Sequence, residues 1–189
     1  MKTKSLLVLF GLAVVLQLAV PAALILKREH ALTHGRAFKF RTAPVDPYDA
    51  FRGRYVALGF DQRAVNAPPN HSFRRHQTVH AILAEDADGF ATFAEISRSR
   101  PLAEPYLTAK IAHVSGDTVY LRLPFDRFYM DETEAPAAER AYRENSARSN
   151  RNAYIGVRIE KGFGVIEDLY VDDTPIRKFL ERPPPERTP

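Results

Sequence analysis

Three histidines lie close together in the sequence and are the first candidates for chemistry: His71, His76 and His80, all within ten residues. Imidazole nitrogens are common zinc ligands, so such a group could surround a metal ion. The spacing is not that of a helical metal motif, and no nearby cysteine or carboxylate completes a ligand set. Because two prolines precede His71 and a strand pattern begins at Thr78, we expect His71 on a loop and the other two histidines on one strand face. We therefore predict exposed histidines, with no metal and no cofactor.

Ser72 and Lys110 are the second candidates, because a serine beside a lysine forms the nucleophilic dyad of peptidases such as signal peptidase. That chemistry needs a hydroxyl next to a desolvated, neutral lysine. The residues around Ser72 read Asn-His-Ser-Phe-Arg and lack the glycine and methionine expected beside such a nucleophile. We favour a loop hydroxyl and a lysine that discourages pairing at a strand edge.

Carboxylates gather at two places in the sequence: Asp131, Glu132 and Glu134 form one group, and Asp46 and Asp49 form the other. Paired acids can perform acid-base chemistry when folding brings them together and separates their pKa values. Helix capping accounts for the first group and turn chemistry for the second. The structural interpretation is favoured, and no catalytic residue is assigned.

Arginines and tyrosines accompany each other in the same two regions, where they could line a pocket for an anion or a carbohydrate. The basic and aromatic members are Arg52, Arg54, Arg127, Tyr48, Tyr55 and Tyr129. The predicted pocket consists of Asp46, Arg52, Arg127, Tyr129 and Glu132. Arginine stacked on tyrosine at a sheet surface is the alternative, and it requires no ligand.

The composition limits which classes of protein this chain can belong to. Its 189 residues suffice for one domain with a substantial core. The 27 basic and 23 acidic residues give a net charge of +4 and are interspersed, so we predict no nucleic-acid partner. The absence of cysteine excludes disulfides and thiol catalysis.

An uncharged apolar segment of 22 residues runs from Ser5 to Leu26. As a helix it would measure about 33 Å, enough to cross a hydrocarbon core of about 30 Å. A cleaved signal peptide is the alternative, since Val20 and Ala22 are small residues near a plausible cleavage point. The apolar run continues to Leu26, however, and favours a retained membrane anchor over residues 1–26, followed by a helix end or stalk over residues 27–36 that Gly35 closes.

The remainder of the chain, residues 37–181, shows the alternating pattern of a mainly β domain. Phe38 and Phe40 mark a first strand, and three hairpins are predicted, at residues 78–96, 109–123 and 154–171. One helix is expected within residues 131–145, with Pro136 in its first turn. The predicted fold is an antiparallel meander or barrel of hairpins with one helix (β-rich α+β), and residues 182–189 form a disordered Pro-rich tail.

The most patterned stretch is residues 53–60, which read Gly-Arg-Tyr-Val-Ala-Leu-Gly-Phe after an Asp-Pro corner at residues 46–47. Alternation divides its side chains between two faces of a strand. One face carries Arg54, Val56, Leu58 and Phe60, and the other carries Tyr55, Ala57 and Gly59. We expect Val56, Leu58 and Phe60 to face the core.

This stretch resembles the signature of the GDYXXLXY family of membrane-anchored bacterial proteins. Gly53, Tyr55 and Leu58 match the signature, whereas Arg54 replaces its aspartate and Phe60 its closing tyrosine. The N-terminal apolar segment, the Asp-Pro corner and the run Arg-Phe-Tyr at residues 127–129, followed by Glu132, are also similar to that family. The resemblance brings no established activity with it.

The positive charges on the two sides of the apolar segment nearly balance, with Lys2 and Lys4 before it and Lys27 and Arg28 after it. The short positive leader before a large domain, together with the resemblance, implies a signal anchor in the bacterial inner (cytoplasmic) membrane, with residues 27–189 periplasmic or otherwise extracytoplasmic. We expect an interaction module whose partners are the membrane, through its own anchor, and another integral membrane protein of the envelope. The alternative is an envelope hydrolase, either of the serine-lysine kind or metal-dependent.

Overall fold

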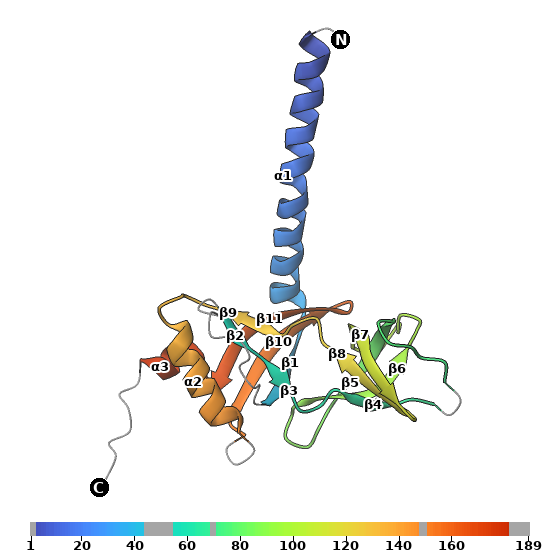
Figure 1. The fold of residues 1–189 in the computed structure, drawn as a ribbon, viewed down its shortest axis with the longest axis vertical. Coiled ribbons are helices and arrows are strands. Elements are labelled where there is room, and N and C mark those ends of the chain that lie inside the picture. Colours follow the sequence, from blue (N-terminus) through green and yellow to red (C-terminus); the bar gives the residue numbers. More distant parts are fainter. Residues whose placement is uncertain (1–2, 44–54, 69–70, 148–150, 182–189) are drawn as a thin grey trace.

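A computed structural model describes residues 3–43, 55–68, 71–147 and 151–181 of the chain. A long N-terminal helix leads into a β-rich domain with two shorter helices (Figure 1). The helices are α1 (Thr3–His34), α2 (Ala135–Ser146) and α3 (Ile176–Leu180). The strands are β1 (Arg36–Ala43), β2 (Tyr55–Ala57), β3 (Gly59–Phe60), β4 (Ala64–Asn66), β5 (Thr78–Glu85), β6 (Ala91–Ser97), β7 (Tyr106–Ser115), β8 (Thr118–Arg122), β9 (Arg127–Tyr129), β10 (Ala153–Glu160), β11 (Phe163–Val171) and β12 (Thr174–Pro175).

Helix α1 projects away from the domain (Figure 1). Its apolar side chains from Leu6 to Leu26 are exposed all around its axis. Among the described residues it is the one helix long and apolar enough to cross a membrane, which is consistent with a single span. The segment predicted as a stalk forms its last turns, because the helix continues to His34. The helix ends where the Gly35 N–H donates to the carbonyl of Ala31, at 2.9 Å.

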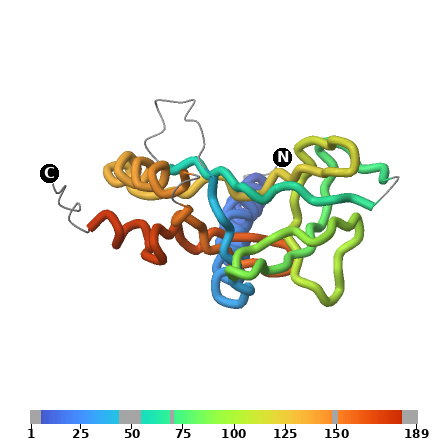
Figure 2. The backbone as a smooth tube through the Cα atoms, turned by 90° about the horizontal axis from the view of Figure 1, so that it is seen from below, coloured from blue at the N-terminus to red at the C-terminus, as the bar shows by residue number. Residues whose placement is uncertain are grey.

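The strands form two five-stranded antiparallel sheets and one two-stranded ribbon. The first sheet has the order β12-β11-β10-β1-β3, the second the order β4-β8-β7-β5-β6, and β2 pairs with β9. Edge strands β4 and β6 of the second sheet contact each other, which makes this sheet nearly a barrel. Figure 2 shows α2 and α3 at one end of the domain and the second sheet at the other.

The three predicted hairpins are confirmed as β5-β6, β7-β8 and β10-β11. Their alternating patterns are local and their turns contain glycines at positive φ, so sequence alone defines them. They do not follow one another in a single meander, since β10-β11 joins β1 in the first sheet. The two sheets share one core, in which the Phe40 ring lies 6.4 Å from that of Phe60 and 5.3 Å from that of Phe125.

The motif stretch is two short strands rather than the single strand predicted. Strand β2 pairs with β9, and β3 pairs with β1. Between them the Leu58 N–H donates to the carbonyl of Asp126 at 2.9 Å, where the chain passes from one partner strand to the other. The predicted faces are confirmed: Val56, Leu58 and Phe60 are buried, whereas the alternating residues are half-buried.

The predicted helix within residues 131–145 is confirmed as α2, and Pro136 lies in its first turn. Asp131 organises the turn before the helix, since its carboxylate accepts from the Thr133 N–H at 2.9 Å. Helix α3 is a second short helix of the domain that the sequence patterns do not predict.

Candidate functional site

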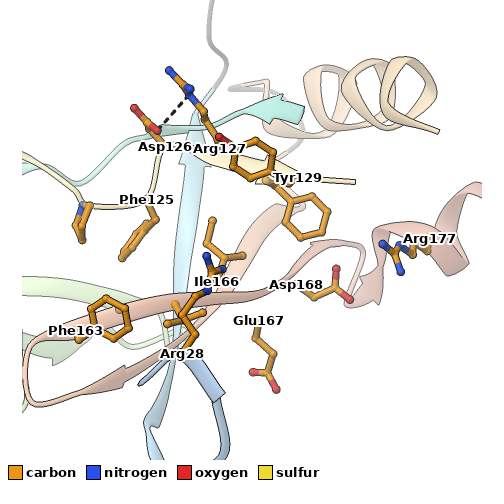
Figure 3. A pocket seen from close by; sticks show the side chains of 14 residues that line it. Arg28, Phe125, Asp126, Arg127, Tyr129, Phe163, Ile166, Glu167, Asp168 and Arg177 are labelled. Carbon is orange, nitrogen blue, oxygen red and sulfur yellow. Dashed lines mark ion pairs between the residues drawn. The ribbon is translucent and has the colours of Figure 1, made fainter. Parts of the chain in front are cut away.

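A pocket of about 570 Å³ lies beside the end of α1, at the side of the domain where the helix enters it (Figure 3). We call it the anchor-side pocket. It is lined by Arg28, Pro124, Phe125, Asp126, Arg127, Phe128, Tyr129, Phe163, Gly164, Val165, Ile166, Glu167, Asp168 and Arg177.

Four parts of the chain build this pocket: α1, the connection from β8 through β9, strand β11, and α3. A bulge in β11 shapes one wall, because Asp168 lies opposite Gly156 and Ile166 opposite Val157, which leaves Glu167 as the extra residue. The Arg158 guanidinium donates two hydrogen bonds of 3.0 Å to the Glu167 carboxylate. The bulge residue is thereby held in one orientation.

The pocket has charges of both signs: arginines 28, 127 and 177 are the cations, and Asp126, Glu167 and Asp168 are the acids. Within the described residues, Arg28 makes no hydrogen bond or ion pair. Burial raises the pKa of Asp168, although its carboxylate accepts from the Leu169 N–H at 2.8 Å and lies near Arg177. This distribution suits a ligand that itself carries polar or charged groups.

Two residues of the pocket predicted from the sequence, Arg127 and Tyr129, line the anchor-side pocket. The Arg127 guanidinium lies 4.9 Å from the ring centroid of Tyr55, and the rings of Tyr55 and Tyr129 are 5.6 Å apart. A hydrogen bond with Tyr129, together with nearby Tyr55 and Asp126, raises the pKa of Arg127, which therefore remains a cation. Arginine-tyrosine stacking, the alternative to a ligand pocket, is thus present at the pocket's wall, and a ligand for these residues stays a prediction.

The other members of the predicted pocket are placed differently. Asp46 and Arg52, like Tyr48, Asp49, Gly53 and Arg54, lie outside the described residues. Glu132 belongs to the turn before α2 and is not among the residues that line the anchor-side pocket.

The histidines are dispersed. The Nε2 atom of His71 lies 3.1 Å from the carbonyl oxygen of Gly116, and Nδ1 of His80 lies 3.1 Å from the Thr108 hydroxyl. The prediction that His76 shares a strand face with His80 is wrong, because His76 occupies a turn with φ of 67° before β5 begins. No group of three histidine, cysteine or acidic side chains within the described residues could hold a metal ion.

Ser72 and Lys110 do not meet the requirements of a nucleophilic dyad. The Ser72 hydroxyl accepts a hydrogen bond from Arg98. Lys110 is exposed on β7, opposite Arg122 and Thr78 of the neighbouring strands. A dyad of this kind needs a lysine that is desolvated beside the serine, so exposed Lys110 and Ser72 do not form the pair that the serine-lysine alternative requires.

The acids before α2 have structural partners. Hydrogen bonds from the Thr133 hydroxyl and N–H lower the pKa of Asp131. Glu134 lies 3.9 Å from Arg177, measured between the carboxylate oxygen and Nε. These contacts are those of a turn before the helix and of packing between α2 and α3, whereas the predicted side-chain cap is not formed, because the N-cap residue Glu134 makes no capping hydrogen bond.

Sequence reasoning missed most of the residues that line the pocket, among them Arg28, Phe163, Asp168 and Arg177. Arg28 had a signal, because it lies two residues beyond the apolar segment, but its position there indicates topology rather than binding. Phe163 and Asp168 lie on β11 and Arg177 lies on α3, and nothing in their local sequence marks them.

A family model described as "GDYXXLXY protein" matches residues 17–169, which include most of α1 and the strands that line the pocket. No curated protein and no solved structure matches the chain.

Proposed function

The chain belongs to the GDYXXLXY family, and on this basis we propose that it is a single-span, membrane-anchored module of the bacterial inner membrane that binds another membrane protein. Its domain lies on the extracytoplasmic side, as the short leader with Lys2 and Lys4 before the apolar segment favours. The binding surface is the anchor-side pocket.

The observation that carries this proposal is the position of the pocket beside the anchor. Arg28 lines it and lies only two residues beyond Leu26, where the apolar segment ends. A ligand in the pocket is therefore close to the membrane surface, where the juxtamembrane segments of other membrane proteins are found. Charges of both signs suit a polypeptide segment that carries both acidic and basic side chains.

Photo-crosslinking in native membranes tests the partner. Benzoylphenylalanine replaces Tyr129, whose side chain is 64% exposed at the pocket. The matched control places the same group at Tyr120, which stacks on His113 in the second sheet, outside the pocket. We expect a discrete crosslinked protein from position 129 that is absent from position 120 and is lost in an Arg28→Glu background.

Two results would overturn the proposal. Crosslinks from position 129 to lipid alone, at native expression, would exclude a protein partner at this pocket. Equal protein crosslinking from positions 129 and 120 would show that contact with the partner is not centred there.

The side of the membrane is tested separately, with a single cysteine in an otherwise cysteine-free chain. Ala87 is exposed in the turn between β5 and β6 and is a suitable site. A membrane-impermeant maleimide should label Ala87→Cys in cells whose outer membrane has been opened. Labelling that appears only after the inner membrane is broken would place the domain in the cytoplasm instead.

A further inference from the structure

Two large hydrophobic side chains of the domain are exposed among the residues that the structure describes. Outside α1, Leu102 and Tyr129 are the exposed large hydrophobic residues in the part of the chain that the structure describes, with exposed fractions of 103% and 64%. Isolated exposed apolar residues are common on protein surfaces, so their exposure alone carries no conclusion. Their position relative to α1 does.

Leu102 lies in the loop from β6 to β7, between Pro101 and Pro105. This loop lines a hollow together with Arg36, the second residue after α1, and with Lys161 in the turn from β10 to β11. The side chain of Lys161 is 86% exposed and reaches Glu160 at 3.5 Å. The exposed leucine is thus held close to the point at which the anchor joins the domain.

Tyr129 lies at the end of β9, in the anchor-side pocket that Arg28 of α1 also lines. The Lys27 ammonium lies 4.2 Å from the ring centroid of Phe163 in the same pocket. Lys27 directly follows the apolar segment, so this wall of the domain lies close enough to the end of that segment for a lysine side chain to reach it. Both exposed apolar residues belong to the side of the domain that α1 enters, and both have basic neighbours.

We propose that Leu102 and Tyr129, with Lys27, Arg28 and Lys161, form a rim that rests on the phospholipid surface of the membrane that α1 crosses. Tyrosine and leucine enter the interfacial layer, where an aromatic ring with a polar tip is favoured. The lysines and the arginine contact the lipid phosphates. This rim holds the domain in one orientation, and it does not depend on a protein partner.

The dimensions agree with this contact. Eight residues separate Leu26 from His34, which is about 12 Å of helix. The headgroup layer occupies about 5–7 Å on each side of the hydrocarbon core. Side chains on this side of the domain have to span only the part of the helix length that exceeds the headgroup layer, and long basic side chains readily extend in this way.

Fluorescence quenching in nanodiscs tests the rim with the full-length chain. Single cysteines, unique in this cysteine-free chain, are introduced at Ala103 next to Leu102, at Tyr129, and at Ala87 as the control. Ala87 precedes Asp88, which pairs with Arg41, five residues along β1 from Arg36 and so about 16 Å farther from α1. Each cysteine carries the same fluorophore, and the quencher is a phospholipid with a nitroxide at headgroup level.

We expect severalfold stronger quenching at positions 103 and 129 than at position 87. Leu102→Asp should remove most of the quenching at position 103, because an aspartate avoids the interface, while leaving the fold intact at a fully exposed site. Quenching at positions 103 and 129 no stronger than at position 87 would overturn the proposal. Quenching at position 103 that Leu102→Asp leaves unchanged would overturn the role of the leucine. Neither result bears on the photo-crosslinking of a protein partner.

Discussion

The Tyr142 hydroxyl connects three elements, and its removal should destabilise the domain measurably. It accepts from the Gly59 N–H at 3.1 Å and donates to the carbonyl of Ala43 at 2.7 Å, which joins α2 to β3 of the motif stretch and to β1. The ring is 3% exposed, and burial raises the pKa of Tyr142, so the hydroxyl stays protonated and able to donate. Tyr142→Phe keeps the ring and removes both hydrogen bonds.

The expected loss follows from the two groups left without a partner. An unsatisfied buried polar group costs about 1–3 kcal/mol, and Gly59 and Ala43 are half-buried, so each should contribute near the lower end. The total is about 2–3 kcal/mol. For a domain of this size a loss of 1 kcal/mol lowers the Tm by about 2–4 °C, which predicts a decrease of about 4–12 °C.

Thermal unfolding of the full-length chain in detergent, followed by the near-ultraviolet circular dichroism of its tyrosines, measures this loss. Tyr120→Phe is the matched control, since the Tyr120 ring stacks on His113 at 4.1 Å and its hydroxyl has no hydrogen bond within the described residues. The control should change the stability by less than about 0.5 kcal/mol. If both variants unfold at the same temperature, the Tyr142 hydroxyl does not stabilise the motif stretch.

Three further predictions concern β10, β11 and the pocket wall. Gly162→Ala should lower the stability by about 1–3 kcal/mol more than Gly89→Ala in thermal unfolding. Both glycines have φ near 80°, so the backbone strain is the same, but a Cβ at Gly162 would lie 2.3 Å from a ring carbon of Tyr106, and equal losses would contradict this. Asp168→Asn should raise the Tm at neutral pH, because the raised pKa of Asp168 means that folding favours its protonated form. The stabilisation from that proton is complete below the ordinary aspartate pKa of about 3.9 and is lost as the pH rises through the pKa of folded Asp168. The advantage of asparagine should therefore disappear in acid, and a difference in Tm that does not depend on pH would refute the argument. Arg158→Lys breaks the bidentate contact with Glu167 but should lower the stability by only about 0.5 kcal/mol in the same assay, since both side chains are about one-third exposed. A loss well above about 1 kcal/mol would show that the bulge depends on this contact.

The hairpins, α2 and the buried face of the motif were predictable because their signals are local. Alternation over a few residues determines which side chains of a strand share a face, so Val56, Leu58 and Phe60 could be assigned to the core before any contact was known. A glycine at a turn and a proline in a first helical turn are equally local. The interruption between β2 and β3 at Leu58 is not a local signal, because it depends on Asp126, a residue nearly seventy positions away.

The anchor-side pocket was only partly predictable for the same reason. Arg127 and Tyr129 attract notice as a charged and aromatic pair, but their neighbours Arg28, Asp168 and Arg177 come from three other elements. Pairing of β2 with β9 brings the motif stretch to this wall, and the bulge in β11 sets the other wall. Both are consequences of strand pairing over long sequence separations, which no periodicity in a single segment encodes.

The way α1 joins the domain determines what the pocket and the rim can contact. A flexible stalk over residues 27–36 would let the domain turn freely, and neither surface would face the membrane for long. Instead Ala31 is buried against the domain with an exposed fraction of 1%, and a Cβ at Gly35 would lie 2.4 Å from the Ala31 carbonyl oxygen and 3.0 Å from the Ile159 nitrogen. Together with the contact of Lys27 with Phe163, these contacts fix about the last two turns of the helix to β10 and β11. Because α1 enters the domain as a rigid element, under the proposed function its tilt in the bilayer would set the orientation of the pocket, and the proposed partner would approach along the membrane surface rather than from the bulk solvent.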